Sequence, residues 1–321
     1  MSEIIRSLGL VSRAEFLLPN LGSLIMGLAW GVAPPISLVD FVVLVALSFT
    51  IINLSSAIGA QANTVSDYEL DKGDERKKQL VQAFESLGRR RVRMLMIGEF
   101  LFALALVSVF MFIQGKPILL GMWIVGISLG WAYSAPPLRI KSRSWLAPVT
   151  LILVLAVFPV LFAYYTFASS VSVNFILSLS GLALTVYGVI IPTEIRDFFG
   201  DRAMGIETMT VRLGLVKASF LSIVLLGVGA VLTGMGFGFE FFSLQQPLLS
   251  VLLVVVAVAV VSVLGKFRRL YLLSKEYARS GKDSVGEQIV SFSADNPRWI
   301  MMVTQTYSLV SIVLLVTKFL V

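Results

Sequence analysis

The stretch NTVSDYELD at residues 63–71 decides how the rest of the chain is interpreted, because it closes a long apolar segment. If the helix of that segment continues, Asn63, Asp67 and Asp71 lie four residues apart and stack on one face. Stacked carboxylates repel each other by a few tenths of a kcal/mol per pair, and desolvation at the border of a membrane raises this cost. The spacing therefore predicts a positive partner between them, and a divalent metal ion fits this requirement.

A second acidic stretch, EIRDFFGD at residues 194–201, repeats the spacing after another long apolar run. Asp197 and Asp201 again lie four residues apart, which predicts a second metal site. The chain has no cysteine and no histidine, so disulfides, zinc sites built from those ligands, thiolate catalysis and imidazole catalysis are excluded. Oxygen ligands favour magnesium, manganese or calcium. Pro192, near the end of this apolar run, predicts either a kink or the end of its helix.

The composition is typical of an integral membrane protein, since 57% of the residues are hydrophobic and only 14% are charged. A net charge of +7 is also found in nucleic-acid-binding proteins, but the excess of lysine and arginine on the cytoplasmic side of membrane proteins explains it better. We therefore expect no nucleic-acid partner. The first ten residues are weakly charged and the next apolar stretch merges into a full span, so no cleavable signal peptide is expected.

Nine apolar segments are long enough to cross a bilayer. They are residues 16–33, 38–62, 94–114, 117–135, 147–168, 173–193, 216–236, 246–265 and 299–320. With the N-terminus in the cytoplasm, nearly all lysines and arginines lie on the cytoplasmic side, and only Lys116 and Lys318 lie toward the outer side. We expect an all-α bundle of nine transmembrane helices that forms one domain over residues 1–321, with a polar cytoplasmic connector at about 266–298.

The loop after the fourth apolar segment, YSAPPLRIKSR at residues 133–143, combines paired prolines with three cations and a tyrosine hydroxyl. The prolines stop the helix, and the topology places this loop on the same side as both acidic stretches. A diphosphate bridged by magnesium requires this combination, because carboxylates hold the metal and lysine or arginine binds the remaining oxygens.

This combination of groups predicts a particular reaction. Two magnesium ions would make an allylic diphosphate a good leaving group. Ionisation leaves an allylic cation, which requires a water-poor cavity and is stabilised by aromatic faces. The nearest aromatic candidates are Tyr68, Tyr133, Tyr187 and Phe198. A second, apolar substrate that enters from the lipid would then be alkylated.

Three motifs stand in a characteristic order along the chain. They are Asn63-xxx-Asp67-xxx-Asp71, the stretch at 133–139, and Asp197-xxx-Asp201-Arg202-xx-Gly205-xx-Thr208 followed by VRLG at 211–214. Together they resemble the UbiA superfamily of intramembrane prenyltransferases, roughly from Arg13 to Gly214. The resemblance implies nine transmembrane helices around a central cavity, and two aspartate-rich motifs that bind magnesium and the isoprenyl diphosphate.

The resemblance also implies a role for each motif residue. One magnesium ion would be bound by Asn63, Asp67 and Asp71. The other would be bound by Asp197 and Asp201. Diphosphate oxygens would be bound by Arg139 and Lys141, together with Lys77 or Lys78. Tyr133 would line the site near the scissile bond, and with the four aspartates it forms the expected catalytic set.

Two positions depart from the family pattern. Thr64 stands where many members carry an aspartate, and residues 77–84 (KKQLVQAF) replace a proline-containing run. Because residues 77–84 differ from the family pattern, the resemblance does not fix the geometry of this loop or the roles of Lys77 and Lys78.

The expected activity is magnesium-dependent transfer of an isoprenyl group from an allylic diphosphate, such as geranylgeranyl diphosphate, to a lipophilic acceptor at the cytoplasmic face of the cell membrane. The acceptor is left open among a quinone precursor, a chlorophyll- or carotenoid-like molecule and an ether-lipid precursor. A secondary transporter that couples ions through its carboxylates is the main alternative, although it would favour acidic residues near the bilayer midplane. The candidates for a general base are Asp71, Glu194, Asp197 and Tyr133, unless the acceptor needs none.

Overall fold

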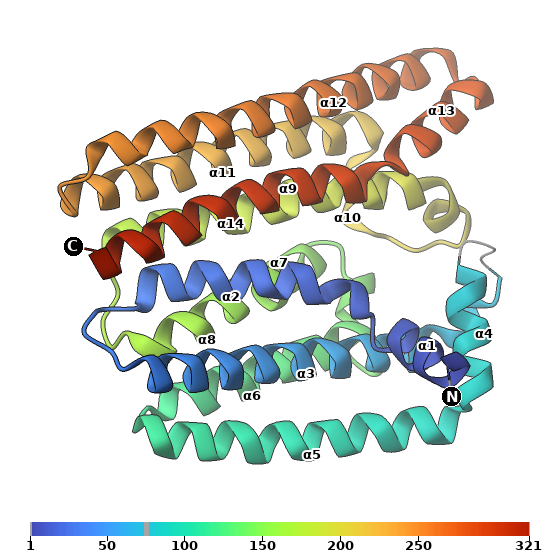
Figure 1. The fold of residues 1–321 in the computed structure, drawn as a ribbon. Coiled ribbons are helices and arrows are strands. Elements are labelled where there is room, and N and C mark those ends of the chain that lie inside the picture. Colours follow the sequence, from blue (N-terminus) through green and yellow to red (C-terminus); the bar gives the residue numbers. More distant parts are fainter. Residues whose placement is uncertain (1, 74–76, 321) are drawn as a thin grey trace.

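The computed structural model describes residues 2–73 and 77–320, and every regular element in this part of the chain is helical (Figure 1). In chain order the elements are α1 (Ser2–Val11), η1 (Ala14–Phe16), α2 (Leu17–Gly31), α3 (Leu38–Asp71), α4 (Lys78–Leu87), α5 (Arg89–Gln114), α6 (Pro117–Ser134), η3 (Ile140–Ser142), α7 (Leu146–Ile152), η4 (Leu153–Val157), α8 (Phe158–Phe167), α9 (Val173–Ala203), α10 (Met209–Leu213), α11 (Leu215–Ser243), η5 (Pro247–Leu252), α12 (Leu253–Ser280), α13 (Asp283–Ser293) and α14 (Asn296–Leu320).

The helix that carries the first acidic stretch is much longer than its apolar segment. α3 has 34 residues, which corresponds to about 51 Å at about 1.5 Å per residue. It starts at a cap in which the Ser37 side chain accepts a hydrogen bond from the Asp40 backbone N–H at 3.0 Å. From there it continues without a break to Asp71. The predicted continuation of this helix through residues 63–71 is therefore present.

The helix that carries the second acidic stretch passes through a proline. α9 has 31 residues and contains Pro192 in its interior. Proline lacks the N–H that would bond to the carbonyl four residues earlier, and here the Ser222 hydroxyl donates to that carbonyl oxygen, Gly188 O, at 2.8 Å. Since this oxygen keeps a donor, the helix continues to Ala203. The alternative that Pro192 ends the helix is therefore wrong.

Eight helical stretches in the described part of the chain are long and apolar enough to cross a membrane. The ninth predicted segment, 16–33, corresponds to α2, which has only 15 residues. Its length is about 22 Å, whereas the hydrocarbon core of a bilayer is about 30 Å thick. α2 nevertheless packs against α3, α8 and α14 within the bundle (Figure 1). The chain is thus an all-helical, multi-pass membrane protein, and the count of nine spans, the central cavity and the cytoplasmic N-terminus stay predictions.

Glycines bring the backbone of α2 into direct contact with α8. A Cβ atom added to Gly27 would lie 2.5 Å from Val160 O, and one added to Gly31 would lie 2.5 Å from Tyr164 O. Side chains larger than hydrogen do not fit at such distances, so the two helices pack with their backbones touching. α2 also contributes to both main cores: Met26 belongs to the core built by α9, α11, α12 and α14, whereas other α2 residues belong to the core built by α3, α5 and α6.

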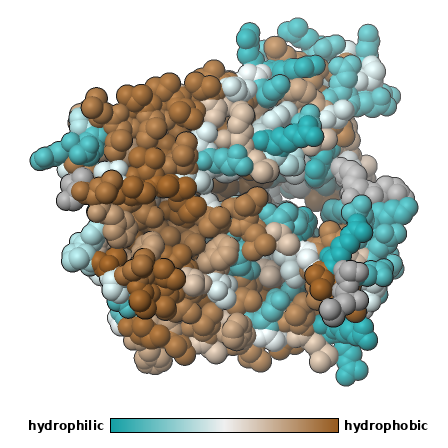
Figure 2. Space-filling model, in the orientation of Figure 1, coloured by the Kyte–Doolittle hydropathy of each residue, from teal (hydrophilic) through white to brown (hydrophobic). Residues whose placement is uncertain are grey.

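The surface is divided into an apolar band and a hydrophilic end. Large apolar side chains point outward along the spans, for example Phe112 (77% exposed), Leu248 (83%) and Val261 (65%). Such a surface suits lipid and not water. Figure 2 shows hydrophobic residues over much of one face, and hydrophilic residues gathered where α1, α4 and α13 lie. The predicted polar connector belongs to this hydrophilic end, where α12 continues to Ser280 and α13 packs against α9.

At the opposite end of the bundle, two lysines bind backbone oxygens at the ends of helices. Lys116 Nζ donates to the carbonyl oxygens of Tyr165 and Ala168, both at 3.0 Å, at the end of α8. Lys318 Nζ donates to Trp30 O at 3.0 Å, in the last turn of α2. Both ammonium groups therefore satisfy carbonyls that have no partner within their own helix.

Candidate active site

The first aspartate motif, which consists of Asn63, Asp67 and Asp71, lies along one face of the last turns of α3. Asp67 and Asp71 are each only 4% exposed, and Asn63 is half-buried. Because buried carboxylates require paired charges or strong hydrogen bonds, the partners of these two residues define the site.

The loop after α6 closes onto this motif. Arg139 Nη2 lies 3.4 Å from Asp67 Oδ1, and Lys141 Nζ forms an ion pair with Asp67 Oδ2. At the end of α6 the Ser134 hydroxyl donates to Asn63 Oδ1 at 2.7 Å. Two of the three cations in the predicted basic loop therefore meet one carboxylate of the first aspartate motif.

Arg139 is held in an unusual backbone conformation. Its φ angle of 38° lies in the left-handed region, which costs a non-glycine residue about 1 kcal/mol or more. Its backbone N–H donates to Ala135 O at 2.9 Å, and the Ser142 hydroxyl donates to Arg139 O at 2.8 Å. These bonds fix the turn that directs the Arg139 side chain toward Asp67.

Lys141 is the more enclosed of the two cations. Its side chain is 21% exposed, whereas that of Arg139 is 38% exposed. Burial lowers the pKa of the Lys141 ammonium, and the Asp67 carboxylate opposes this shift. The paired geometry therefore keeps a positive charge in a place where burial alone disfavours it.

The two lysines at the start of α4 occupy different environments. Lys77 Nζ donates to Asp71 Oδ1 at 2.6 Å, whereas Lys78 is exposed. Of the two, the structure thus brings Lys77 to the first aspartate motif. Tyr68 lies apart from the site, because its hydroxyl donates to Glu85 at 2.7 Å and its ring packs on Phe84.

The second aspartate motif, which consists of Asp197 and Asp201, receives a cation from its own helix. Arg196 Nε and Nη2 donate to the two oxygens of Asp197, each at 3.0 Å. The side chain of Asp197 is 31% exposed, and Asp201 is half-buried one turn further along α9. Arg196 therefore engages its neighbouring carboxylate in a bidentate pair.

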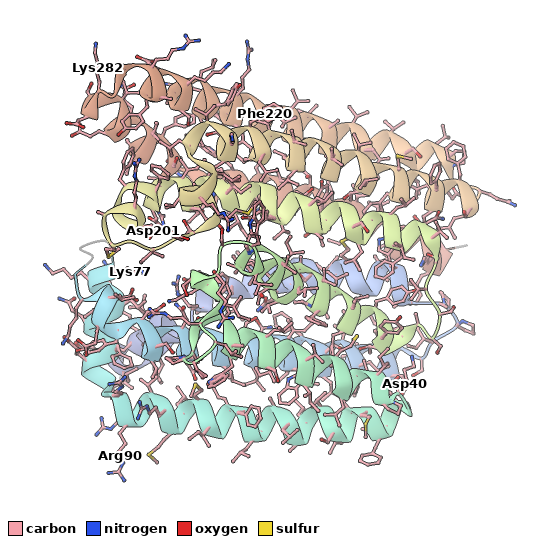
Figure 3. The ribbon with its side chains drawn as sticks, turned by 180° about the vertical axis from the view of Figure 1, so that it is seen from behind. Asp40, Lys77, Arg90, Asp201, Phe220 and Lys282 are labelled. Atoms are coloured by element: carbon pink, nitrogen blue, oxygen red, sulfur yellow. The ribbon has the colours of Figure 1, made fainter. Side chains whose placement is uncertain are left out.

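Tyr133 interacts electrostatically with residues of both motifs. Its hydroxyl, in the last turn of α6, lies within electrostatic range of the carboxylates of Glu194, Asp67 and Asp201. Figure 3 shows Lys77 and Asp201 at the same end of the bundle, and Asp40 at the other end. Acidic groups from α3 and α9 therefore lie within electrostatic range of the same tyrosine, and the loop between α6 and α7 adds two cations beside the first motif.

Two residues of this site were not predicted from the sequence. Ser134 binds Asn63, and Thr210, in α10, donates through Oγ1 to Glu194 Oε2 at 2.7 Å. Ser134 lies within the stretch at 133–139, and Thr210 lies between Thr208 and the VRLG stretch at 211–214, yet a hydroxyl gives no pattern that reveals its partner.

The donor groups fit magnesium only together with oxygens from a substrate. No group of three or more acidic side chains in residues 2–73 and 77–320 is close enough to hold a metal ion by itself. Each aspartate motif instead offers two carboxylates at helical spacing, and the first adds an amide oxygen. Magnesium commonly joins one or two carboxylates to phosphate oxygens. The residues present therefore suit a magnesium ion that is shared with a diphosphate.

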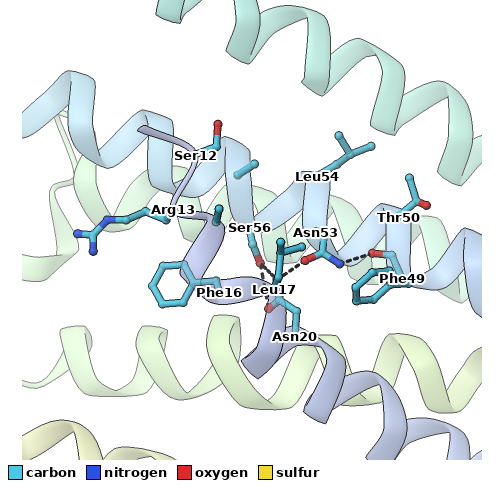
Figure 4. A pocket seen from close by; sticks show the side chains of 12 residues that line it. Ser12, Arg13, Phe16, Leu17, Asn20, Phe49, Thr50, Asn53, Leu54 and Ser56 are labelled. Carbon is cyan, nitrogen blue, oxygen red and sulfur yellow. Dashed lines mark hydrogen bonds between the residues drawn. The ribbon is translucent and has the colours of Figure 1, made fainter. Parts of the chain in front are cut away.

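A separate cavity of about 380 Å³ opens between η1, α2 and α3 (Figure 4). Its wall includes Asn20, whose Nδ2 donates to Asn53 Oδ1 at 2.9 Å and to Ser56 Oγ at 3.0 Å. These three polar groups satisfy one another in a mostly apolar wall and tie α2 to α3. The cavity lies along the same helix as the first aspartate motif, on turns that precede it.

Comparisons with known proteins identify the fold. One solved structure with this fold is of digeranylgeranylglyceryl phosphate synthase, with a TM-score of 0.63 and 12% identity over 97% of this chain and 99% of that chain. A UbiA homologue from Archaeoglobus fulgidus bound to GPP and Mg2+ gives 0.62 and 15% identity over 98% of both chains. The apo UbiA homologue from Aeropyrum pernix K1 gives 0.63 and 15% identity over 89% of this chain and 97% of that chain.

The sequence itself matches a family model. No curated protein sequence matches the chain, but the model of the UbiA prenyltransferase family matches residues 19–279. This match spans most of the chain and includes all the motifs described above. The chain is therefore a member of the UbiA prenyltransferase family, and it is an enzyme of the intramembrane prenyltransferase class.

Proposed function

We propose that this chain transfers an isoprenyl group from an allylic isoprenyl diphosphate to a lipophilic acceptor, in a magnesium-dependent reaction carried out by residues 1–321 as a single domain. The observation that carries the proposal is that Asp67 of the first motif pairs with Arg139 and Lys141 of the basic loop, while Tyr133 beside this loop interacts electrostatically with both Asp67 and Asp201. Carboxylates for a metal and cations for phosphate oxygens are thereby combined at the end of an apolar bundle. A transporter would instead place its carboxylates near the bilayer midplane.

The diphosphate would lie between the two motifs. Asn63, Asp67 and Asp71 would hold one magnesium ion, and Asp197 and Asp201 the other. Arg139 and Lys141 would bind phosphate oxygens that the metal leaves free, with Lys77 at the edge of the site. The structure of the Archaeoglobus fulgidus homologue with GPP and Mg2+ supports this class of substrate. Bound magnesium supplies charge neutralisation of the leaving diphosphate.

The protein would contribute orientation and exclusion of water. The isoprenyl chain would extend from the diphosphate into the apolar bundle, where water is scarce and a cationic centre survives long enough to be captured. Tyr133 would stand beside the bond that breaks. Its ring and that of Tyr187 offer the aromatic faces that stabilise positive charge. Tyr68 is not needed for this role.

The acceptor would enter from the bilayer, since the outer faces of the spans contact lipid. A quinone precursor, a chlorophyll- or carotenoid-like molecule and an ether-lipid precursor all fit this route. We place the chain in the cell membrane with its active site toward the cytoplasm, because the hydrophilic end carries the basic loops that the positive-inside rule assigns to that side.

The test is binding of geranylgeranyl diphosphate to the purified chain, with magnesium and then with a chelator. We expect binding with magnesium, and loss of binding with the chelator and in the Asp67→Ala variant. Asp295→Ala is the matched control, because Asp295 is an exposed aspartate that pairs with Arg298 on the surface. Equal binding in the presence and absence of magnesium, or full binding by Asp67→Ala, would contradict the proposal.

A further inference from the structure

Glu194 is a carboxylate of the site that belongs to neither aspartate motif. It lies on α9, three residues before Asp197 and seven before Asp201. At 3.6 residues per turn these spacings bring all three side chains to one face of the helix. Glu194 is half-buried, and the Thr210 hydroxyl donates to its Oε2 at 2.7 Å.

The contacts of Glu194 with the described residues involve hydroxyl groups. It interacts with the hydroxyls of Tyr187 and Tyr133. Among the residues that the structure describes, no lysine or arginine forms an ion pair with it. Three other carboxylates of this site, Asp67, Asp71 and Asp197, each bind a cation instead.

This difference separates the candidates for a general base. Lys77 binds an oxygen of Asp71 at 2.6 Å, and Arg196 binds both oxygens of Asp197 at 3.0 Å. Their lone pairs are thus engaged by positive groups before any substrate arrives. Tyr133 would become an anion among carboxylates if it gave up its proton, which is unfavourable. Glu194 is the candidate whose carboxylate is held by a neutral hydroxyl.

The depth of Glu194 in the bundle is also suitable for a group that accepts a proton near the reacting carbon. Because α9 runs toward the hydrophilic end, Glu194 lies about 4.5 Å deeper in the bundle than Asp197 and about 10 Å deeper than Asp201, at about 1.5 Å per residue. A diphosphate held by the aspartates would direct its isoprenyl carbon toward this depth. An apolar acceptor that approaches this carbon from the lipid side would meet the Glu194 carboxylate.

We propose that Glu194 accepts the proton that the acceptor loses at its reacting atom. A bond forms between that atom and C1 of the isoprenyl group, the bond between C1 and oxygen breaks, and the diphosphate leaves with the electron pair. The proton of the acceptor passes to the carboxylate of Glu194. This inference rests on the proposed function and narrows the acceptor to molecules that carry a proton at the reacting atom, such as an alcohol, a phenol or an aromatic carbon.

The test uses Glu194→Gln, which keeps the shape of the side chain and an oxygen that accepts from Thr210 but removes the basic carboxylate. Magnesium-dependent binding of geranylgeranyl diphosphate is measured first, and transfer is then measured with a dihydroxynaphthoate and with a prenylglycerol phosphate as acceptors. We expect binding within about twofold of the unmodified chain and a kcat for transfer lower by about 10²-fold or more. Glu194→Asp should restore part of the rate, and Glu207→Gln, an exposed glutamate of the neighbouring loop, should behave as the unmodified chain.

The outcomes distinguish this inference from the proposed function. Failure of the unmodified chain to bind the diphosphate would refute the proposed function, whatever Glu194 does. Normal binding and normal transfer by Glu194→Gln would refute the role of Glu194 alone. A variant that loses binding together with transfer would mean that Glu194 supports the diphosphate site and is not the proton acceptor.

Discussion

The two aspartate motifs share a four-residue spacing, yet the cations that pair with Asp67 and Asp71 and the arginine that pairs with Asp197 come from different parts of the chain. The first motif receives Arg139 and Lys141 from the loop after α6 and Lys77 from the start of α4. In the second motif, Asp197 receives Arg196, its neighbour in sequence. The ion pairs of the first motif therefore join separate segments of the chain. The pair between Arg196 and Asp197 in the second motif is formed within α9.

The largest effects are expected from substitution of the aspartates, and they concern both diphosphate binding and the stability of the fold. Asp67→Ala and Asp201→Ala should each abolish magnesium-dependent diphosphate binding, and Asp67→Ala should also lower the free energy of unfolding by about 2 kcal/mol, because it leaves two partly buried cations without this partner. Binding assays and thermal unfolding in detergent measure the two effects. An unchanged unfolding temperature in Asp67→Ala would show that the ion pairs of Asp67 with Arg139 and Lys141 do not stabilise the fold.

The next largest effects on diphosphate binding are expected from substitution of the cations that pair with the two motifs. Arg139→Ala and Lys141→Ala should each weaken diphosphate binding by about 10- to 100-fold, because each removes a charged hydrogen bond worth about 1.5–3 kcal/mol. Arg196→Ala should change the affinity by no more than about threefold, since a partly exposed pair contributes about 0–1 kcal/mol. Titration of the three variants with the same diphosphate makes the comparison. A similar loss in all three would mean that Arg196 also binds substrate.

A smaller effect is expected beside the second motif. Thr210→Val removes the hydroxyl that positions Glu194 but leaves the carboxylate in place. The kcat for transfer should fall by about 10-fold while the affinity for the diphosphate stays the same. Thr210→Ser, which restores the donor, should recover most of the rate. An unchanged kcat in Thr210→Val would mean that Glu194 does not depend on this bond.

The smallest effect is expected at the edge of the first motif. Lys77→Ala should weaken diphosphate binding by about fivefold or less, because the Lys77 side chain is 42% exposed and an exposed pair contributes about 1 kcal/mol at most. Lys72→Ala is the matched control, since Lys72 is exposed and lies over the Tyr68 ring, away from the site. A loss of 100-fold in Lys77→Ala would place Lys77 among the principal diphosphate ligands.

The features that follow from local pattern were predictable from the sequence. Apolar runs predicted the spans, and four-residue spacing predicted that each acidic stretch occupies one helix face. The fate of Pro192 was not predictable, because it depends on a hydroxyl from Ser222 on another helix. The short length of α2 was also hidden, since the apolar run continues past Gly31, where the helix ends.

Contacts between distant segments were beyond local pattern. The pair between Asp67 and Arg139 joins residues 72 positions apart, and no spacing rule selects Arg139 over Arg143 for this contact. The same limitation applied to the general base. Asp71, Glu194, Asp197 and Tyr133 were equivalent candidates in the sequence. The positions of Lys77 and Arg196 separate Glu194 from Asp71 and Asp197.

The short α2 has a consequence for the surrounding lipid. A helix of about 22 Å beside spans that reach about 30 Å or more creates a hydrophobic mismatch, to which a bilayer responds by thinning locally. Glycine contacts fix α2 against α8, so the helix does not tilt freely to adjust. The membrane beside α2 is therefore expected to be thinner, and an amphiphile in one leaflet would have a shorter path there to the depth of the reacting groups.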